Sequence, residues 1–280
     1  MKILSFYSEK GGMGKTTFTA LFASWLAYVK KEKVIVLDFD FPGYQMYNMR
    51  NIDSILLQNG DPKLTLLVGD NKPYKVERVM AKSKGYTDEQ LKEIVTNMRK
   101  LKEKPDGYVL CDFPGSFLKN GACYQLINER LIDLVVFPID TDRQSVSSML
   151  NIFYIMNDPS KMPGLFSRKE DLSAGKEAGV QTPLHAQKVL ALWNKETQNE
   201  RSKGNRDWYG PTERLLKQMG IPICRTRMRN IEILRRDPPT FGFIRNTVCW
   251  PSDNVKQRCP YIEDIFDEIK ARLDGSWEEE

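Results

Sequence analysis

Short apolar runs recur along the chain and alternate with stretches in which apolar residues follow a helical period. The runs are rich in Val, Ile and Leu, which is typical of buried strands. Strands that alternate with helices indicate a parallel sheet. We therefore predict an α/β fold with a mostly parallel twisted sheet and helices on both of its faces. The predicted strands are Lys2–Tyr7, Lys33–Phe39, Tyr108–Phe113, Asp133–Ile139, Val189–Trp193 and Pro222–Arg227.

Four stretches carry clear helix signals. Apolar positions spaced by three, four and seven residues predict a helix from Thr16 to Lys31. A second helix begins at Thr87, whose hydroxyl can form a capping box with Gln90. A third begins near Arg143, and a last one spans Tyr261–Leu273. We interpret the apolar stripe along each helix as the face that packs on the core.

The length and composition fit one domain spanning residues 1–280. The chain has 280 residues, of which 41% are hydrophobic, and this is enough for one large core. No internal repeat is visible. Two polar stretches, 158–183 and 195–207, predict long loops, and loops of that length in a compact domain are usually functional or disordered.

The residues available for chemistry exclude several classes of site. His185 is the one histidine, which argues against a histidine-based triad and a multi-histidine metal site. Five cysteines without a C-x-x-C pair argue against a disulfide framework and a zinc site. No signal segment precedes the first glycine loop, and no apolar run is long enough to span a membrane. We expect a cytoplasmic protein, whose net charge of +5 permits a nucleic-acid partner without requiring one.

A glycine-rich loop follows the first predicted strand and leads into the first helix. Glycines let backbone N–H groups turn toward phosphate oxygens, and the helix N-terminus adds a positive partial charge. Lys15 would reach the β- and γ-phosphates of ATP, Thr16 would ligate Mg²⁺, and Thr17 would contact the α-phosphate. The loop reads Lys10-Gly11-Gly12-Met13-Gly14-Lys15-Thr16-Thr17.

This loop departs from the strict Walker A pattern because Glu9 stands where the first glycine belongs. It fits the deviant Walker pattern K-G-G-x-G-K-T-[ST], and the chain here resembles the ParA/MinD family of P-loop ATPases. The resemblance implies that Lys10 is catalytic and reaches across an ATP-dependent homodimer to the phosphates of the other subunit. What Glu9 does beside the phosphates is left open.

Three carboxylates follow predicted strands at the family's spacing. The resemblance implies that Asp38 acts near Mg²⁺ and that Asp40 orients the attacking water as a catalytic residue. Asp112 resembles the Walker B aspartate, which would hold the metal together with Thr16. For Asp38 or Asp40 taken alone, a strand-end carboxylate that caps a loop is the structural alternative.

Asn194 follows the strand Val189–Trp193 and resembles the family's adenine-reading asparagine. Its side-chain amide offers both a donor and an acceptor to the adenine edge. The alternative is a turn residue that ends the strand.

The basic residues of the C-terminal third suggest a nucleic-acid partner. Arg225, Arg227 and Arg229 would project from one face of an extended segment, with Glu232 and Asp237 as the opposing charges nearby in the sequence. Such a row can follow DNA phosphates, as the ParA branch of the family does without base specificity. The alternative is a solvated basic edge that keeps a strand from pairing.

Two functions therefore remain open. One is an ATPase that partitions or maintains a plasmid or mobile element, with a ParB-like partner protein stimulating hydrolysis and with association to the nucleoid. The chain is also similar to ParA-like proteins of conjugative transposons over Phe22–Lys30 and Asp38–Pro42. The other is a nucleotide-gated scaffold that recruits a partner protein without DNA. The acidic end Glu278–Glu280 argues against a membrane anchor of the MinD kind.

Overall fold

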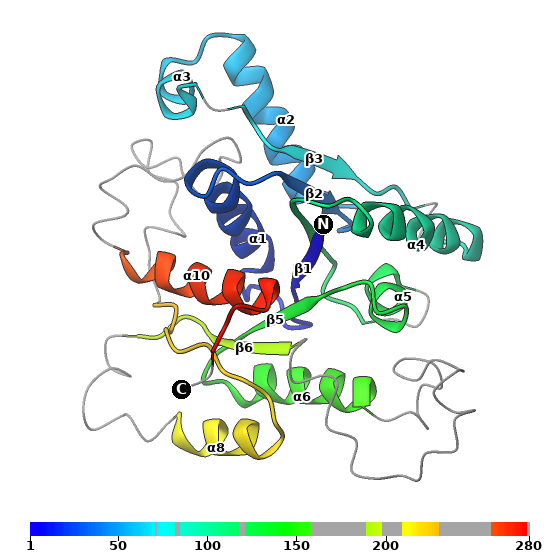
Figure 1. Cartoon of the computed structure of the whole chain (residues 1–280), viewed down its shortest axis with the longest axis vertical. Coiled ribbons are helices and arrows are strands. Elements are labelled where there is room, and N and C mark those ends of the chain that lie inside the picture. Colours follow the sequence, from blue (N-terminus) through cyan, green and yellow to red (C-terminus); the bar gives the residue numbers. More distant parts are fainter. Residues whose placement is uncertain are drawn as a thin grey trace.

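A six-stranded sheet forms the centre of the protein, and every described pair of its strands is parallel. The computed structural model describes residues 1–70, 72–81, 85–117, 121–157, 189–197, 209–229 and 259–278. The strands lie in the order β3-β2-β4-β1-β5-β6 (Figure 1). Their bounds are β1 Lys2–Phe6, β2 Val34–Asp38, β3 Lys75–Arg78, β4 Tyr108–Asp112, β5 Leu134–Ile139 and β6 Val189–Trp193.

Helices cover both faces of this sheet, so the strands alternate their side chains between two separate apolar cores. Leu4, Phe6 and Val36 point into the core beneath α1 and α10, whereas Ile3 and Val109 point into the core beneath α4, α5, α6 and α8. The predicted α/β class with a parallel sheet between two helical layers is confirmed. The helices are α1 Lys15–Ser24, α2 Gln45–Gln58, α3 Pro62–Val68, α4 Asp88–Lys102, α5 Ala122–Asn128, α6 Arg143–Asn157, α8 Gly210–Gln218 and α10 Tyr261–Asp274.

The helix signals are confirmed with one change of geometry. Thr87 and Gln90 form the predicted capping box at the start of α4. The helix expected from Thr16 to Lys31 is α1 followed by the π-helical turn Trp25–Val29. Trp25 stacks on Phe22 and contacts Phe266 of α10, so the widened turn lies where these large rings pack together.

The strands of the structure differ from the predicted strands in two places. The run Pro222–Arg227 forms no described strand, and Ile223 within it makes one isolated parallel bridge, with Ala191; a second bridge joins Arg229, just after the run, to Glu196. Strand β3 was not predicted, because three of its four residues are charged and it lies at the sheet edge with β2 as its one described neighbour. An edge strand needs no continuous apolar run.

The long loop expected at 158–183 lies outside the described residues, as does 198–207 of the loop expected at 195–207. Within the described ranges, no helix has the length and apolar character needed to cross a membrane.

Candidate nucleotide site

The glycine loop connects β1 to α1 in the geometry that phosphate binding requires. Gly12 and Gly14 have φ angles of 70° and 81°, and Gly14 is the N-cap of α1. Residues other than glycine rarely adopt this left-handed backbone. The loop therefore directs the free N–H groups of the first turn of α1 outward, where they can bind an anion.

Lys15 lies at the start of α1 between the loop and the strand ends. Burial lowers the pKa of its ammonium group, whereas the nearby carboxylates of Asp112 and Asp40 raise it. Gly115, after β4, approaches so closely that a Cβ there would lie 3.1 Å from the Glu9 carbonyl oxygen and 3.5 Å from the Lys15 Nζ. A half-buried cation between glycine backbones is suited to neutralise phosphate charge.

Asp38 and Asp112 lie side by side because they are register partners at the ends of β2 and β4. The Asp38 carboxylate is fully buried and accepts hydrogen bonds from the backbone N–H groups of Asp40, at 3.0 Å, and Tyr47, at 2.9 Å. Burial raises its pKa, and these two hydrogen bonds oppose the rise. Asp38 thus holds the segment after β2 in place and brings Asp40 to the same edge of the sheet.

Asp112 has the character of a metal-binding carboxylate. It is almost fully buried, and neither of its oxygens accepts a hydrogen bond of good geometry from the described part of the chain. Burial, and then the charge of Asp38, raise its pKa to about 8, although the Thr16 hydroxyl opposes this. Since a buried acceptor is rarely left without a partner, the arrangement fits a bound cation. Within the described residues, no cluster of three or more metal-binding side chains occurs, and Mg²⁺ commonly keeps several waters and takes one or two carboxylates.

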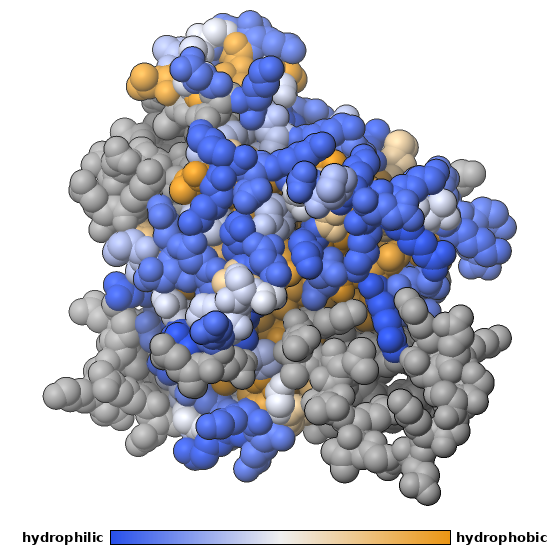
Figure 2. All heavy atoms as spheres, viewed as in Figure 1, coloured by the Kyte–Doolittle hydropathy of each residue, from blue (hydrophilic) through white to orange (hydrophobic). Residues whose placement is uncertain are grey.

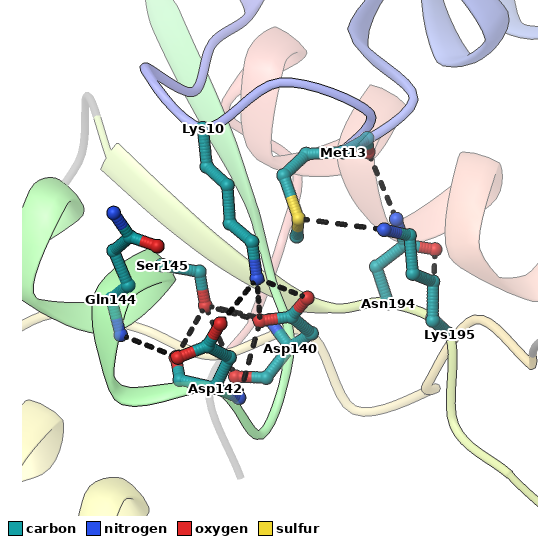
Figure 3. A network of polar contacts seen from close by, with 8 residues as sticks. All are labelled: Lys10, Met13, Asp140, Asp142, Gln144, Ser145, Asn194 and Lys195. Carbon is teal, nitrogen blue, oxygen red and sulfur yellow. Dashed lines mark hydrogen bonds and ion pairs between the residues drawn. The ribbon is translucent and has the colours of Figure 1, made fainter.

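Lys10 folds back onto its own chain, which differs from the expectation that it points toward a second subunit. Its Nζ lies 3.0 Å from Asp140 Oδ2 and 2.8 Å from Asp142 Oδ2 (Figure 3). Desolvation opposes its charge, but the hydrogen bonds to Asp142 and Asp140 outweigh it and raise the pKa of Lys10. Ser145 in the first turn of α6 bonds to Asp140 and fixes its position.

Asn194 lies against the glycine loop, where its amide is bonded within the chain. Its Nδ2 donates to the Met13 carbonyl oxygen at 2.9 Å, and its Oδ1 accepts from the Lys195 N–H at 2.9 Å (Figure 3). The residue therefore couples the end of β6 to the phosphate loop. Its reading of adenine stays a prediction, with one amide proton available for it besides the bond to Met13.

The three arginines of the C-terminal row line one open hollow of about 550 Å³. Arg225 and Arg229 are exposed, and their guanidinium groups lie over the rings of Trp277 and Tyr261. The two aromatic rings therefore hold these guanidinium groups at the surface, where their charge is accessible to solvent.

Arg227 differs from its two neighbours. It is half-buried, and its guanidinium donates to Glu213 at 2.9 Å and to Glu196 at 3.4 Å. It also lies over the ring of Tyr209. The opposing charges expected from the sequence, Glu232 and Asp237, lie outside the described residues.

Sequence reasoning missed several polar partners at the site. Glu9 accepts a hydrogen bond from Ser148 of α6, which attaches the outer arm of the loop to that helix. Glu196 and Glu213, which belong to other segments of the chain, neutralise Arg227. Helix α6 had been recognised only by its apolar stripe, so its polar side carried no signal for the contact with Glu9.

Comparison with known proteins agrees with this geometry. The profile of the CobQ/CobB/MinD/ParA nucleotide binding domain matches residues 4–248. No curated protein sequence matches the chain.

Solved structures share the fold at low sequence identity. The chain is similar to MinD in the MinC:MinD cell division complex of Aquifex aeolicus, with a TM-score of 0.60, 16% identity and coverage of 100% and 98% of the two chains. The chain is also similar to a putative plasmid partition protein of Borrelia burgdorferi bound to AMPPNP, with a TM-score of 0.56 and 15% identity. This match covers 96% of the present chain and 99% of the Borrelia protein. The match to the ParA of pNOB8 bound to nonspecific DNA has a TM-score of 0.55 and 14% identity, and it covers 99% of each chain. With most of its length matched by one family profile, this chain belongs to the CobQ/CobB/MinD/ParA family of nucleotide-binding domains.

Proposed function

We propose that the protein is an ATPase that binds Mg²⁺–ATP in the loop of residues 10–17 and dimerises around the nucleotide. The observation that carries the proposal is the buried carboxylate of Asp112 beside Thr16 and Lys15 at the N-terminus of α1, whose oxygens accept no hydrogen bond of good geometry from the described residues. Lys15 would neutralise the β- and γ-phosphates, and the N–H groups of the loop with Thr17 would bind the remaining oxygens. Mg²⁺ would be held by Thr16 and Asp112, with Asp38 supporting the site from the adjacent strand.

The metal would offset phosphate charge and orient the phosphate chain. Residues of the chain itself would position the attacking water and hold the loop closed. Asp40 would position the attacking water, because it leaves the sheet edge next to Asp38 and Asp112. Asn194 would keep the loop closed against the end of β6 and would offer its second amide proton to the base.

We further propose that the ATP-bound dimer binds DNA without base specificity through Arg225 and Arg229, and so partitions or maintains a DNA element. Two solved relatives of this fold support it, one a putative plasmid partition protein and one a ParA bound to nonspecific DNA. Arg227 would not bind DNA, because Glu196 and Glu213 already balance its charge. It would hold the row in place rather than contact phosphates.

The nucleotide-gated scaffold that recruits a protein partner remains the second candidate. The likeness to MinD in a complex with MinC favours it. DNA retention separates the two, since only the partition function needs it.

Replacing Arg225 and Arg229 together by alanine should weaken DNA binding and flatten its salt dependence. Each lost phosphate contact should change the slope of log affinity against log salt by about 0.9. The measurement is a salt titration with mixed-sequence DNA and a non-hydrolysable ATP analogue. Arg227→Ala is the matched control, which should keep the parent slope but lower the melting temperature. If the parent does not bind DNA even at low salt, the scaffold function replaces the partition function.

Lys10→Ala should abolish ATP-dependent dimers, because the proposal places this cation on the partner subunit's phosphates. Lys10 must first leave Asp140 and Asp142, so Asp140→Asn with Asp142→Asn should strengthen the dimer. An ion pair of this kind is worth roughly 0.2–1 kcal/mol, which corresponds to a gain of at most about fivefold for each of the two pairs that the double variant removes. Sedimentation velocity with an ATP analogue measures both. A dimer yield that none of these variants changes would contradict the role of Lys10.

A further inference from the structure

Helix α2 packs some of its apolar residues on the core, but it also buries both of its charged residues and leaves three large apolar residues exposed. Its two charged residues, Arg50 and Asp53, are 7% and 1% exposed. Its apolar residues Ile52 and Ile55 are 58% and 55% exposed, and Leu56 is also exposed. A helix of a monomeric protein normally places such residues the other way round, with the apolar stripe on the core. This placement is the feature that needs an explanation.

The orientation of α2 is fixed by what it buries. The Arg50 guanidinium lies 4.4 Å from the centre of the Tyr74 ring, in contact with its π face. Met46, one turn earlier on the same side, is fully buried in the core beneath α1. Buried charges are costly unless they are paired or stacked, so a rotation that covered the isoleucines would remove Arg50 from its partners. The exposure of Ile52, Ile55 and Leu56 is therefore a stable part of the fold.

The outward face of α2 also carries no charge. In a chain with 28% charged residues, the exposed positions from the start of α2 to its C-cap are all amides or apolar side chains. Figure 2 shows apolar residues gathered at the top of the view, over α2 and α3. The exposed positions are Gln45, Asn48, Asn51, Ile52, Ile55, Leu56, Gln58 and Asn59.

Helix α3, which is in contact with α2, exposes a further apolar residue. Asp61 caps its start by accepting from the Leu64 N–H, and Leu64 and Val68 pack into the core. Leu66, on the opposite side of α3, is 83% exposed. Among the described residues, four of the six large exposed hydrophobic side chains lie on these two helices. We call Ile52, Ile55, Leu56 and Leu66 the α2–α3 face.

The chemistry of this face selects one kind of occupant. Ile52, Ile55 and Leu56 have the three- and four-residue spacing that packs against the ridge of another helix. A lipid surface is disfavoured, because interfacial helices carry Lys or Arg on their polar face and the exposed positions of α2 have neither. A second copy is disfavoured by size, since a stable dimer buries ~20–30 residues on each side, whereas the exposed described positions from Gln45 to Val68 number about a dozen.

We propose that the α2–α3 face binds an amphipathic helix of a partner protein through an apolar, uncharged contact stripe. The position gives such a partner access to the nucleotide site. The Tyr47 N–H at the start of α2 donates to Asp38, and the Tyr44 N–H donates to the Asp40 carbonyl oxygen. Ile52 follows Tyr47 by five residues, which is about 8 Å along the helix. The partner would thus lie on the helix whose start is hydrogen-bonded to the Asp38 carboxylate and to the Asp40 backbone.

The test uses a fluorescein-labelled helical peptide with a leucine stripe at three- and four-residue spacing and glutamine elsewhere. A twin peptide with glutamine in place of the stripe leucines serves as the ligand control. Fluorescence anisotropy with the full chain, without nucleotide or DNA, measures binding. We expect saturable binding of the leucine peptide alone, weakened at least tenfold by Ile55→Gln with Leu56→Gln. Leu215→Gln, an exposed leucine on α8, is the matched variant and should bind as the parent does.

Four results would overturn the proposal. They are an absence of saturable binding by the parent, equal binding by the double variant, equal binding of the twin peptide, and loss of binding in Leu215→Gln. Sedimentation of the parent as a dimer that the double variant abolishes would assign the face to a second copy. Retention on phosphatidylcholine–phosphatidylglycerol vesicles, lost in the same variant, would assign it to lipid. Because no nucleotide or DNA is present, failure here leaves the ATPase and DNA proposals standing.

Discussion

Replacing Lys15 by alanine is expected to lower ATP affinity by about tenfold to a hundredfold. Charge-assisted contacts are worth ~1.5–3 kcal/mol each, and each 1.4 kcal/mol corresponds to a factor of ten. The Lys15 ammonium is half-buried beside Asp112 and close to Gly115, so water can replace its charge only in part. Titration with a fluorescent ATP analogue in the presence of Mg²⁺ measures the change.

The matched control is Lys10→Ala in the same loop. It removes the same positive charge, but from a side chain that pairs with Asp140 and Asp142 and does not lie at the proposed phosphate site. At protein concentrations that keep the chain monomeric, this variant should bind ATP as the parent does. If Lys15→Ala also binds ATP with parent affinity, the loop is not the phosphate site.

Asp40→Ala is expected to reduce ATP hydrolysis by about a hundredfold or more while ATP stays bound. A positioned base or water-orienting group typically contributes a factor of ~10²–10⁴. The backbone at this position should survive the change, because the bonds from Asp40 N–H to Asp38 and from Tyr44 N–H to the Asp40 carbonyl use no side-chain atom of Asp40. Phosphate release measures turnover, and light scattering should detect an accumulated ATP dimer.

Asp70→Ala supplies the comparison, since Asp70 is an exposed carboxylate after α3 with no place at the strand ends. Its hydrolysis rate should equal the parent rate. Parent-level turnover in Asp40→Ala would place the water-orienting group elsewhere, whereas loss of ATP binding would indicate that Asp40 supports the loop itself.

The local sequence determined the phosphate loop and the strand ends of the nucleotide site. β1, the glycine loop and α1 are consecutive in the chain, so the placement of Gly14, Lys15 and Thr16 depends on short-range geometry. Asp38 and Asp112 end apolar strands, and in a parallel sheet the ends of adjacent strands meet at one edge. The two apolar runs place both aspartates at that edge, whereas the folded sheet makes β2 and β4 neighbours and pairs Asp38 with Asp112.

Long-range packing decided the partners of the charged side chains. No local pattern indicates that Lys10 pairs with Asp140 and Asp142, or that Glu213 of α8 neutralises Arg227, because each pair is made by packing between different elements. The same holds for α2, whose sequence mixes apolar and amide residues without a clean stripe. Only the folded protein shows that Arg50 and Asp53 face inward and that Ile52 and Ile55 face solvent, since the Tyr74 ring that contacts Arg50 precedes β3.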